Sequence, residues 1–182
     1  TQVFRFFTQS DVEVNNCYMQ HYASVFKPTE VRMMLAAFSN IETIHISAYS
    51  HLLDTLGMPE TEYEAFLHYK EMTDKWDYMR GFNVDSKRDI AKTMAMFGAF
   101  TEGLQLFASF AILLNFPRFN KMKGMGQIVA WSARDETLHM QSVVRLFKTF
   151  IAENPEVWDE DLERELYRAC ETVVHHEDAF ID

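Results

Sequence analysis

Apolar side chains recur along this chain at alternating steps of three and four residues, the spacing that keeps them on one stripe of an α-helix. Four such stripes are present, in residues 4–25, 31–56, 95–113 and 125–150. Each stripe is interrupted by carboxylates or histidines at positions that the periodicity assigns to its buried side: Asp11, Glu42, His45, Glu102, Glu136 and His139. An ionised carboxylate is costly to bury without a partner, so the pattern predicts a compensating positive charge inside the protein.

Proline, glycine and acidic residues mark the first two helices. The first core helix is predicted from the start of the chain to about Val25, before Lys27 and Pro28. Pro28 and Glu30 form a usual helix start, so they should open the second core helix. That helix should close at residues 56–59, where glycine and then proline follow the last apolar position.

The middle of the chain is predicted to hold a shorter pair of helices and then the third core helix. The pair should occupy roughly residues 60–79, with a loop at residues 80–83. The third core helix should run from near Ser86 to near Phe116, because Pro117 lies directly beyond it.

The last third of the chain shows the same signals. The turn at residues 121–126 should lead into the fourth core helix, which we expect to stop near residues 153–155. A final helix should begin at the acidic residues 159–161 and continue to the end of the chain. No segment shows the alternation of a strand, so we predict an all-α fold with four core helices and additional helices.

Composition supports one globular domain over residues 1–182. Apolar residues make up 48% of the chain and aromatic residues 14%, with only six glycines and four prolines. The formal net charge of −10 makes nucleic acid and anionic membrane surfaces unfavourable partners. The apolar stretch around residues 107–116 is too short to span a bilayer. Two cysteines, Cys17 and Cys170, are too few for a disulfide framework and favour a reducing cytoplasm.

Both ends of the chain carry helical patterns. The first residue is Thr1, and an amphipathic pattern is already present at residues 3–7. Residues 173–182 also keep a helical rhythm without a stop signal. We therefore interpret the chain as the middle of a longer protein whose remaining parts lie outside it.

The polar positions within the stripes have the spacing of metal ligands. Glu42 and His45 are three residues apart, as are Glu136 and His139, so each pair projects to one side of its helix. Two such pairs and single carboxylates from two other helices form the arrangement of ferritin-like dinuclear carboxylate proteins. Oxygen and imidazole ligands without thiolates suit iron or manganese. We therefore predict a dinuclear metal site at the centre of a ferritin-like four-helix bundle.

Three residues near this constellation have alternative roles. Asp11 has polar neighbours, so by itself an exposed or capping role fits it as well as ligation does. Asp135 could accept the outer N–H of a ligating histidine, or it could form a surface salt bridge with Arg134. Residues 175–178 look like metal ligands, but adjacent histidines diverge on a helix, and an exposed face is the favoured interpretation.

Tyr49 lies one turn beyond His45 and two turns beyond Glu42 on the same stripe. Its phenol should therefore lie beside the metals, as a core residue with one hydrogen bond or as a site of oxidation to a phenoxyl radical. Leu106 and Phe110, one and two turns past Glu102, would add apolar walls that keep solvent from such a radical.

The residue types, order and spacing from Asp11 through residues 41–45, Tyr49 and Glu102 to residues 134–139 resemble the small (β, radical-generating) subunit of class I ribonucleotide reductase. The resemblance covers nearly the whole chain. It implies that the six polar positions listed above are the dimetal ligands, Tyr49 the radical-bearing tyrosine and Asp135 the acid that is hydrogen-bonded to His45. It also implies two iron ions, with manganese or a mixed pair as alternatives.

The same resemblance implies partners and an activity. The family forms a homodimer, uses O2, and pairs with a large catalytic (α) subunit to reduce ribonucleotides to deoxyribonucleotides. Leu106 departs from the phenylalanine of well-known members, whereas Phe110 is kept. The family's N-terminal tryptophan and its C-terminal docking tail would lie outside residues 1–182, so we expect a radical-generating core without the parts for delivery.

Two other functions use the same bundle. One is an O2-dependent di-iron oxidase or hydroxylase, and the other is an iron-storage or metal-binding protein. An aspartate as the first ligand favours the reductase over the oxidases, which usually have a glutamate there. Tyr49 on the ligand stripe favours the reductase over a storage protein.

Overall fold

The computed structural model describes residues 2–59 and 68–181, which form helices joined by short connections. The elements, in chain order, are α1 (Gln2–Asn16), η1 (Cys17–Tyr22), α2 (Ala23–Val25), α3 (Thr29–Thr55), α4 (Lys70–Arg80), α5 (Lys87–Met94), η4 (Ala95–Gln105), α6 (Leu106–Arg118), α7 (Lys123–Glu153), η5 (Pro155–Val157) and α8 (Glu160–Ile181). No strand occurs in these two ranges. The predicted all-α fold is confirmed.

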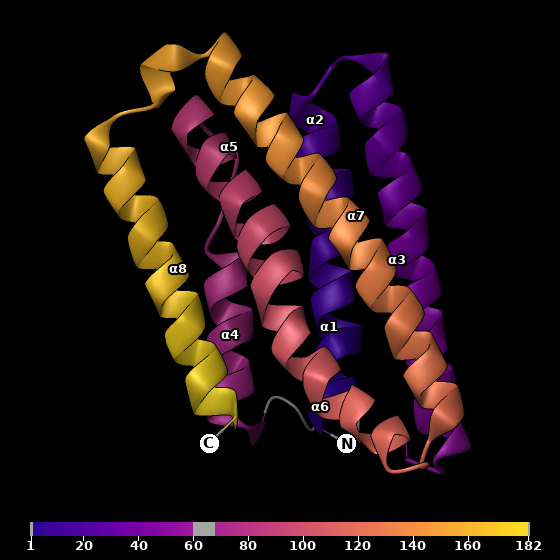
Figure 1. Ribbon diagram of the computed structural model, residues 1–182. Helices are drawn as coiled ribbons and strands as arrows, with labels where there is room; N and C mark the ends of the chain where they lie inside the picture. The colour runs from indigo at the N-terminus through magenta and orange to yellow at the C-terminus, as the bar shows by residue number, and fades with distance from the viewer. Residues whose placement is uncertain (1, 60–67, 182) are drawn as a thin grey trace.

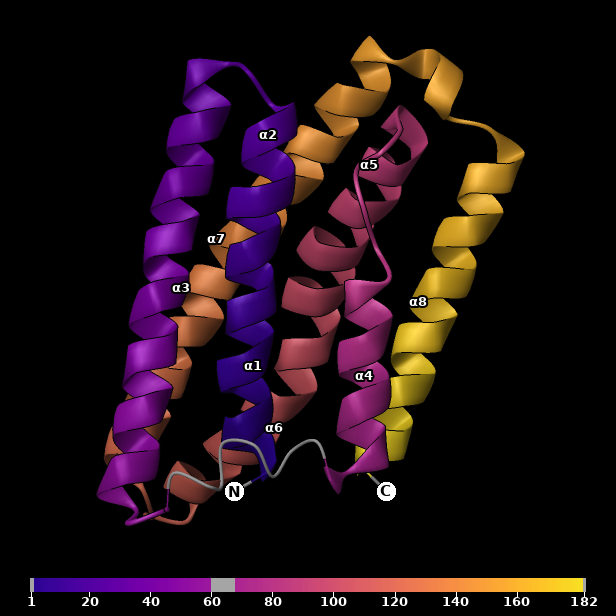
Figure 2. The ribbon, with the colours of Figure 1, turned by 180° about the vertical axis from the view of Figure 1, so that it is seen from behind.

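Four long rods form the core of the bundle, and two further helices pack beside it. The rods are α1–η1–α2, α3, α5–η4–α6 and α7, which run side by side in Figure 1. Helices α4 and α8 pack on each other, and they meet the core through α1 and η4 respectively. The view from behind in Figure 2 shows the same pairing of α4 with α8 and of α1 with α3. The expectation of four core helices with extra helices therefore describes the molecule.

Most predicted helix starts are correct, and two have an identifiable cap. The Ser86 hydroxyl accepts a hydrogen bond from the backbone N–H of Asp89 at 3.1 Å and so caps α5. The carboxylate of Asp159 accepts the backbone N–H of Leu162 at 2.6 Å at the start of α8. Of the predicted helical pair at residues 60–79, residues 60–67 lie outside the described residues, and the second helix is α4.

Two predicted boundaries at the end of the third and the start of the fourth rod need correction. Pro117 lies inside α6, which continues one residue further, to Arg118; the missing N–H of the proline costs the helix one hydrogen bond just before its end. The turn ends at Met122 rather than at residue 126, since α7 begins at Lys123. Asn120 and Met122 both have positive φ, at 63° and 47°, so non-glycine residues make this tight reversal.

Two segments, η1 and η4, are π-helical, which the periodicity did not predict. A π-turn contains more residues than an α-turn, so positions beyond it shift around the helix. In the third rod the predicted stripe positions Ala95 and Ala99 are only half-buried, whereas Phe97 and Thr101 are fully buried. Glu102 remains on the buried side.

The third rod as a whole, Lys87–Arg118, is longer than the apolar stretch identified in the sequence. It has 32 residues and a most apolar window of mean hydropathy 1.5, so by length and composition alone it could cross a membrane. Half of that window is buried inside the protein.

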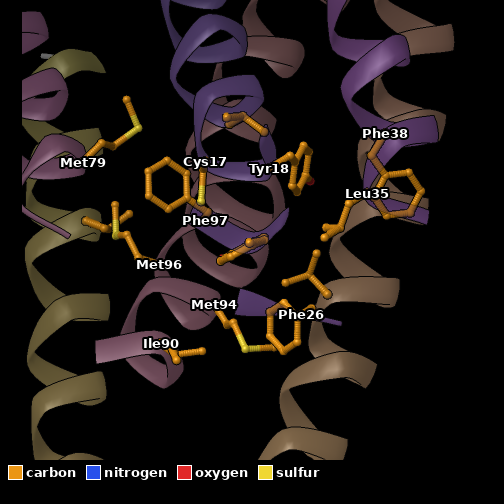
Figure 3. Close-up of a cluster of buried hydrophobic side chains, with 14 residues drawn as sticks. Cys17, Tyr18, Phe26, Leu35, Phe38, Met79, Ile90, Met94, Met96 and Phe97 are labelled. Carbon is orange, nitrogen blue, oxygen red and sulfur yellow. The ribbon is translucent and has the colours of Figure 1, made fainter. Parts of the chain in front are cut away.

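Two clusters of buried apolar side chains lie on either side of the polar positions along α3 and α7. Phe38 and Val143 belong to the cluster drawn in Figure 3, which includes Cys17, Tyr18 and the buried methionines of the third rod. Tyr49 and Val129 belong to the second cluster. On each helix the glutamate and histidine lie between these markers in sequence, so the polar centre is enclosed between two apolar layers.

Gly98 allows the third rod and α7 to approach each other closely. A Cβ atom built on Gly98 would lie 2.3 Å from Cγ1 of Val143, a distance that real contacts do not reach. Glu102 follows Gly98 by four residues, and His139 precedes Val143 by four residues. The missing side chain thus brings together the two helices that carry these polar groups.

Candidate metal centre

The structure brings all six polar stripe residues together in the core. Asp11 comes from α1, Glu42 and His45 from α3, Glu102 from η4, and Glu136 and His139 from α7. None of the six has more than 4% of its surface exposed. Burial excludes the exposed role that was open for Asp11, and its position inside α1 excludes the capping role. Ligation of a metal by these residues stays a prediction.

The six residues form two overlapping groups that share Glu42. Glu42, Glu102, Glu136 and His139 have potential ligand atoms within 4.8 Å of one another, and so do Asp11, Glu42 and His45. We call these the His139 group and the His45 group. Two groups with a common carboxylate are the arrangement expected for two cations bridged by a carboxylate.

Both histidines direct Nδ1 toward the carboxylates. Nδ1 of His45 lies 3.0 Å from Oε1 of Glu136 and 3.5 Å from Oε2 of Glu42. Nδ1 of His139 lies 2.9 Å from Oε1 of Glu42, and 3.6 Å from an oxygen each of Glu102 and Glu136. The residues three apart on α3 and on α7 therefore face the same space, as the sequence predicts.

The electrostatics of the centre show how strongly these charges interact. Burial and the charges of Glu42 and Glu136 hold the pKa of Asp11 well above its usual value. Burial likewise raises the pKa of Glu102 to about 8, although His139 acts in the opposite direction. Without a cation, Asp11 and Glu102 therefore keep their protons more readily than ordinary carboxylic acids, which lowers the negative charge of the centre.

The pKa values of the two imidazoles also depend on burial and on the neighbouring charges. Burial by itself lowers the pKa of His45, but the carboxylates of Glu136 and Glu42 raise it to about 11. Burial by itself also lowers the pKa of His139, but the carboxylates of Glu102, Glu136 and Glu42 raise it to about 12. Imidazolium ions would thus supply the positive charge that metal ions would otherwise bring.

Several polar atoms of the centre are buried without a well-aligned hydrogen bond, although they lie close to one another. They are Oδ2 of Asp11, Oε1 and Oε2 of Glu42, Nδ1 of His45, Oε2 of Glu102, Oε2 of Glu136, and both ring nitrogens of His139. Atoms that face a common space but do not bond one another are suited to a shared cation. Four carboxylates match the charge of two divalent ions, and oxygen and imidazole donors suit iron or manganese. The residues present fit a dimetal centre.

Asp135 makes both contacts that the sequence left open. Its Oδ2 lies 3.4 Å from Nε2 of His45, on the side of the ring away from the carboxylates. Its Oδ1 accepts hydrogen bonds from the exposed Arg134 at 3.0 and 3.1 Å. Asp135 can therefore accept a hydrogen bond from the Nε2–H group of His45 and so hold the tautomer whose Nδ1 is unprotonated and can bind a metal.

Tyr49 is buried next to the centre and is held by one hydrogen bond and an aromatic stack. Its hydroxyl donates to Oγ of Ser132 at 2.9 Å. The ring of Phe7 stacks on Tyr49 with centroids 4.9 Å apart and planes 7° apart, and Phe110 stacks on Phe7 at 5.0 Å. Leu106 is buried in the same cluster, as expected for a wall.

Sequence reasoning did not identify Phe7 and Ser132 as neighbours of Tyr49. Phe7 is one turn before Asp11, and Ser132 is one turn before Glu136, so both share a stripe with a predicted ligand. Their contacts with Tyr49 depend on how α1 and α7 lie against α3. The position of each residue on an apolar stripe was the available signal, but a stripe does not show which residue of another helix a side chain contacts.

Tyr18 is a second tyrosine at the centre that the sequence did not single out. Its hydroxyl donates a hydrogen bond to Oε1 of Glu102, and its ring is buried. Burial, and then the charge of Glu102, raise the pKa of the Tyr18 phenol. It therefore remains a neutral hydrogen-bond donor.

The expected exposed face at residues 175–178 requires one correction. His175 is exposed, but Glu177 is buried and forms an ion pair with Lys75 of α4. Nζ of Lys75 also lies over the ring of Phe6, 3.7 Å from its centroid. This contact joins α4 to α8, away from the metal centre. Glu177 is buried there because it faces another helix instead of solvent.

The chain is similar to proteins of known family over its whole length. The model of the family described as ribonucleotide reductase, small chain, matches residues 1–182. A probable ribonucleoside-diphosphate reductase small subunit, 376L, of Invertebrate iridescent virus 6 is 45% identical over 200 residues, which cover 100% of this chain and 56% of the relative. A corresponding protein, 048L, of Invertebrate iridescent virus 3 is 43% identical over 199 residues, 100% of this chain and 53% of the relative.

A more distant match comes from a bacterium. The ribonucleoside-diphosphate reductase subunit beta of Chlamydia pneumoniae is 26% identical over 185 residues, which cover 94% of this chain and 53% of the relative. The chain thus spans about half the length of these curated relatives.

Proposed function

The chain belongs to the ribonucleotide reductase small-chain family, and from that membership we propose that it houses the radical-generating centre of a ribonucleoside-diphosphate reductase. In this proposal Asp11, the five other stripe residues and two iron ions form the centre, and Tyr49 carries the radical. A large catalytic subunit would use the radical to convert ribonucleotides to deoxyribonucleotides. The observation that carries the proposal is the convergence of all six ligand-type residues in the core beside Tyr49.

The proposed ligands divide between two metal positions. His45 and Asp11 would bind one ion, His139 and Glu102 the other, and Glu42 and Glu136 would lie between them. When bound, two iron ions would supply the O2-dependent oxidation that removes one electron from a nearby phenol. Asp135 would hold the ring of His45 and its tautomer, so that Nδ1 faces the ion.

Tyr49 has the environment that a stable phenoxyl radical requires. Burial and then the charge of Asp11 raise the pKa of Tyr49, so the phenol is neutral and must lose a proton together with its electron. That proton is directed at Oγ of Ser132. Phe7 covers one face of the ring, and Leu106 and Phe110 belong to the same apolar cluster, which excludes water and reductants.

The proposal is tested by locating the ions in crystals of the protein loaded with Fe(II) or Mn(II). Anomalous scattering at the two metal edges should show two peaks roughly 3.5–4 Å apart among the six side chains. Absence of peaks there, at saturating metal, would contradict the proposed centre.

Metal loading should also raise thermal stability. An ion that binds only the folded state contributes about 2.7 kcal/mol at a free concentration of one hundred times its dissociation constant. For a chain of this size that corresponds to a midpoint higher by roughly 5–10 °C. Circular dichroism melts with and without Fe(II) under anaerobic conditions measure the shift, with the exposed Glu163→Gln variant as the control that should keep it. Equal midpoints at saturating metal would count against a buried site.

We further propose that a second copy of the chain covers the outward face of α3. Between Arg32 and Asp54 the exposed side chains carry no carboxylate, lysine or arginine: Met33, Ala36, Ala37, Asn40, Thr43, Ile44, Ser47 and His51. A long uncharged helix face is unusual on a chain with net charge −10 and suits an isologous dimer contact.

The Ile44→Lys substitution should therefore convert dimer to monomer in sedimentation velocity, because the symmetric contact would bury two ammonium groups. Tyr167→Lys on the charged helix α8 is the matched control, since Tyr167 is exposed to a similar degree. A wild-type protein that sediments as a monomer at micromolar concentration would refute this assignment.

A further inference from the structure

Tyr18 is the tyrosine of the centre that the proposed function does not use. It lies in the π-helical segment η1, and its hydroxyl donates to Oε1 of Glu102 in the π-helical segment η4. Both side chains are fully buried. In Figure 3 the ring of Tyr18 lies between Cys17 and Phe38 in the apolar cluster. The two irregular helical segments thus meet through one hydrogen bond at the wall of the centre.

The ring of Tyr18 is held on several sides. Phe38 and Tyr22 each lie with ring centroids 6.0 Å from it, and the His139 ring lies edge-on at 6.2 Å. A hydroxyl that is buried among these rings cannot exchange its partner for bulk water, so it keeps its hydrogen bond to Glu102. The second oxygen of Glu102, Oε2, has no hydrogen bond and remains available.

Tyr18 contacts only one of the two ligand groups. Glu102 belongs to the His139 group and not to the His45 group. Any effect of Tyr18 that acts through Glu102 should therefore fall on one metal position. This asymmetry distinguishes a role in positioning Glu102 from general support of the core, because general support would affect both metal positions.

Tyr22 shows what an ordinary buried tyrosine does in the same segment. It follows Tyr18 by four residues and is equally buried. Its hydroxyl donates to the backbone carbonyl of Thr93 at 3.0 Å instead of to a carboxylate of the centre. The two residues therefore form a matched pair that differs in the acceptor.

We propose that Tyr18 is a positioning residue that holds Glu102 in the orientation in which Oε2 binds the metal ion of the His139 group. The inference rests on the proposed function, because it requires the dimetal centre. Tyr18 itself touches neither O2 nor the radical site. It orients one carboxylate, and outer partners of metal ligands contribute about 10- to 100-fold in affinity.

The test compares Tyr18→Phe with Tyr22→Phe in anaerobic titrations with Mn(II). Calorimetry and the electron paramagnetic resonance signal of free Mn(II) measure the binding. The wild type should bind two ions. Tyr18→Phe should bind one ion as the wild type does and the other about 10- to 100-fold more weakly. Tyr22→Phe should bind both as the wild type does. Equal weakening of both ions in Tyr18→Phe, or no weakening, would overturn the inference.

A double substitution checks that Tyr18 acts through Glu102. Tyr18→Phe combined with Glu102→Ala should bind the weaker ion no more weakly than Glu102→Ala alone, because the acceptor of the hydrogen bond is then absent. Additive losses would show that Tyr18 acts by another route and would overturn the proposed mechanism.

A measurement on the wild type covers the case in which Tyr18→Phe does not fold. In metal-loaded crystals the Tyr18 hydroxyl should remain within hydrogen-bond distance of Glu102 while the other oxygen of Glu102 contacts the ion. A loaded structure with the two residues apart would refute the positioning role alone. Wild-type protein that binds no metal would instead refute the proposed function.

Discussion

Tyr49→Phe is expected to abolish the organic radical that forms when O2 is added to the anaerobic protein loaded with Fe(II). The substitution removes the O–H that must lose a proton and an electron, while it leaves the ring stacked on Phe7. The six proposed ligands are unchanged, so oxidation of the iron should proceed. Electron paramagnetic resonance measures the radical, and optical absorption measures the oxidised iron.

Tyr22→Phe is the control for this experiment, because Tyr22 is a buried tyrosine that bonds a backbone carbonyl and should leave the radical unchanged. A radical that survives in Tyr49→Phe would move the assignment to another residue, and Tyr18 would be the first to examine. Oxidised iron without a radical in the wild type at any time would favour the O2-dependent oxidase alternative.

The second large effect concerns stability and the buried pair of Lys75 and Glu177. Lys75 has 0% and Glu177 6% of its side chain exposed. Burial lowers the pKa of Lys75 and raises the pKa of Glu177, although each partner opposes the shift of the other. Removal of one partner leaves an uncompensated buried charge, so Lys75→Met should lower the free energy of unfolding by about 3–5 kcal/mol.

The double variant Lys75→Met with Glu177→Leu should recover most of that loss, because two apolar side chains of similar size can replace a buried ion pair. Urea denaturation of both single variants and the double variant, without metal, completes the cycle. If the losses of unfolding free energy of the two single variants simply add in the double variant, Lys75 and Glu177 do not act as a pair.

The direction in which pH changes the stability of Lys75→Met follows from the burial of Glu177. In Lys75→Met the pKa of Glu177 stays raised above that of the unfolded chain, and its partner no longer lowers it. Stability from such a group is present below the unfolded pKa and is lost as pH rises through the folded pKa. The deficit of Lys75→Met relative to the wild type should therefore be smaller at pH 5 than at pH 8. A deficit that grows toward acid would contradict this interpretation.

The family comparisons confirm the family that the resemblance indicated. The metal, the radical and the roles of single residues are proposals of their own, each with the experiment given above. The structure adds the geometric condition that those proposals need, namely the meeting of residues from four rods in one buried space.

Local periodicity was sufficient to predict the helical stripes and the six polar residues on them. A helix repeats every few residues, so positions three and four apart necessarily share a face, and a carboxylate in an apolar stripe must turn inward with it. The pairs of Glu42 with His45 and of Glu136 with His139 could therefore be read from spacing alone. Their convergence required only that four amphipathic helices bury their stripes against one another.

The contacts between distant segments were decided by the tertiary structure. The stack of Phe7 on Tyr49 and the ion pair of Lys75 with Glu177 join different helices, and the hydrogen bond from Tyr18 to Glu102 joins residues 84 positions apart. The π-helical turns in η1 and η4 also altered the faces that a regular repeat assigns. Spacing along one helix determines which side a residue faces, but the partner it meets depends on the depth and rotation at which another helix packs, and those follow from the fit of the whole core.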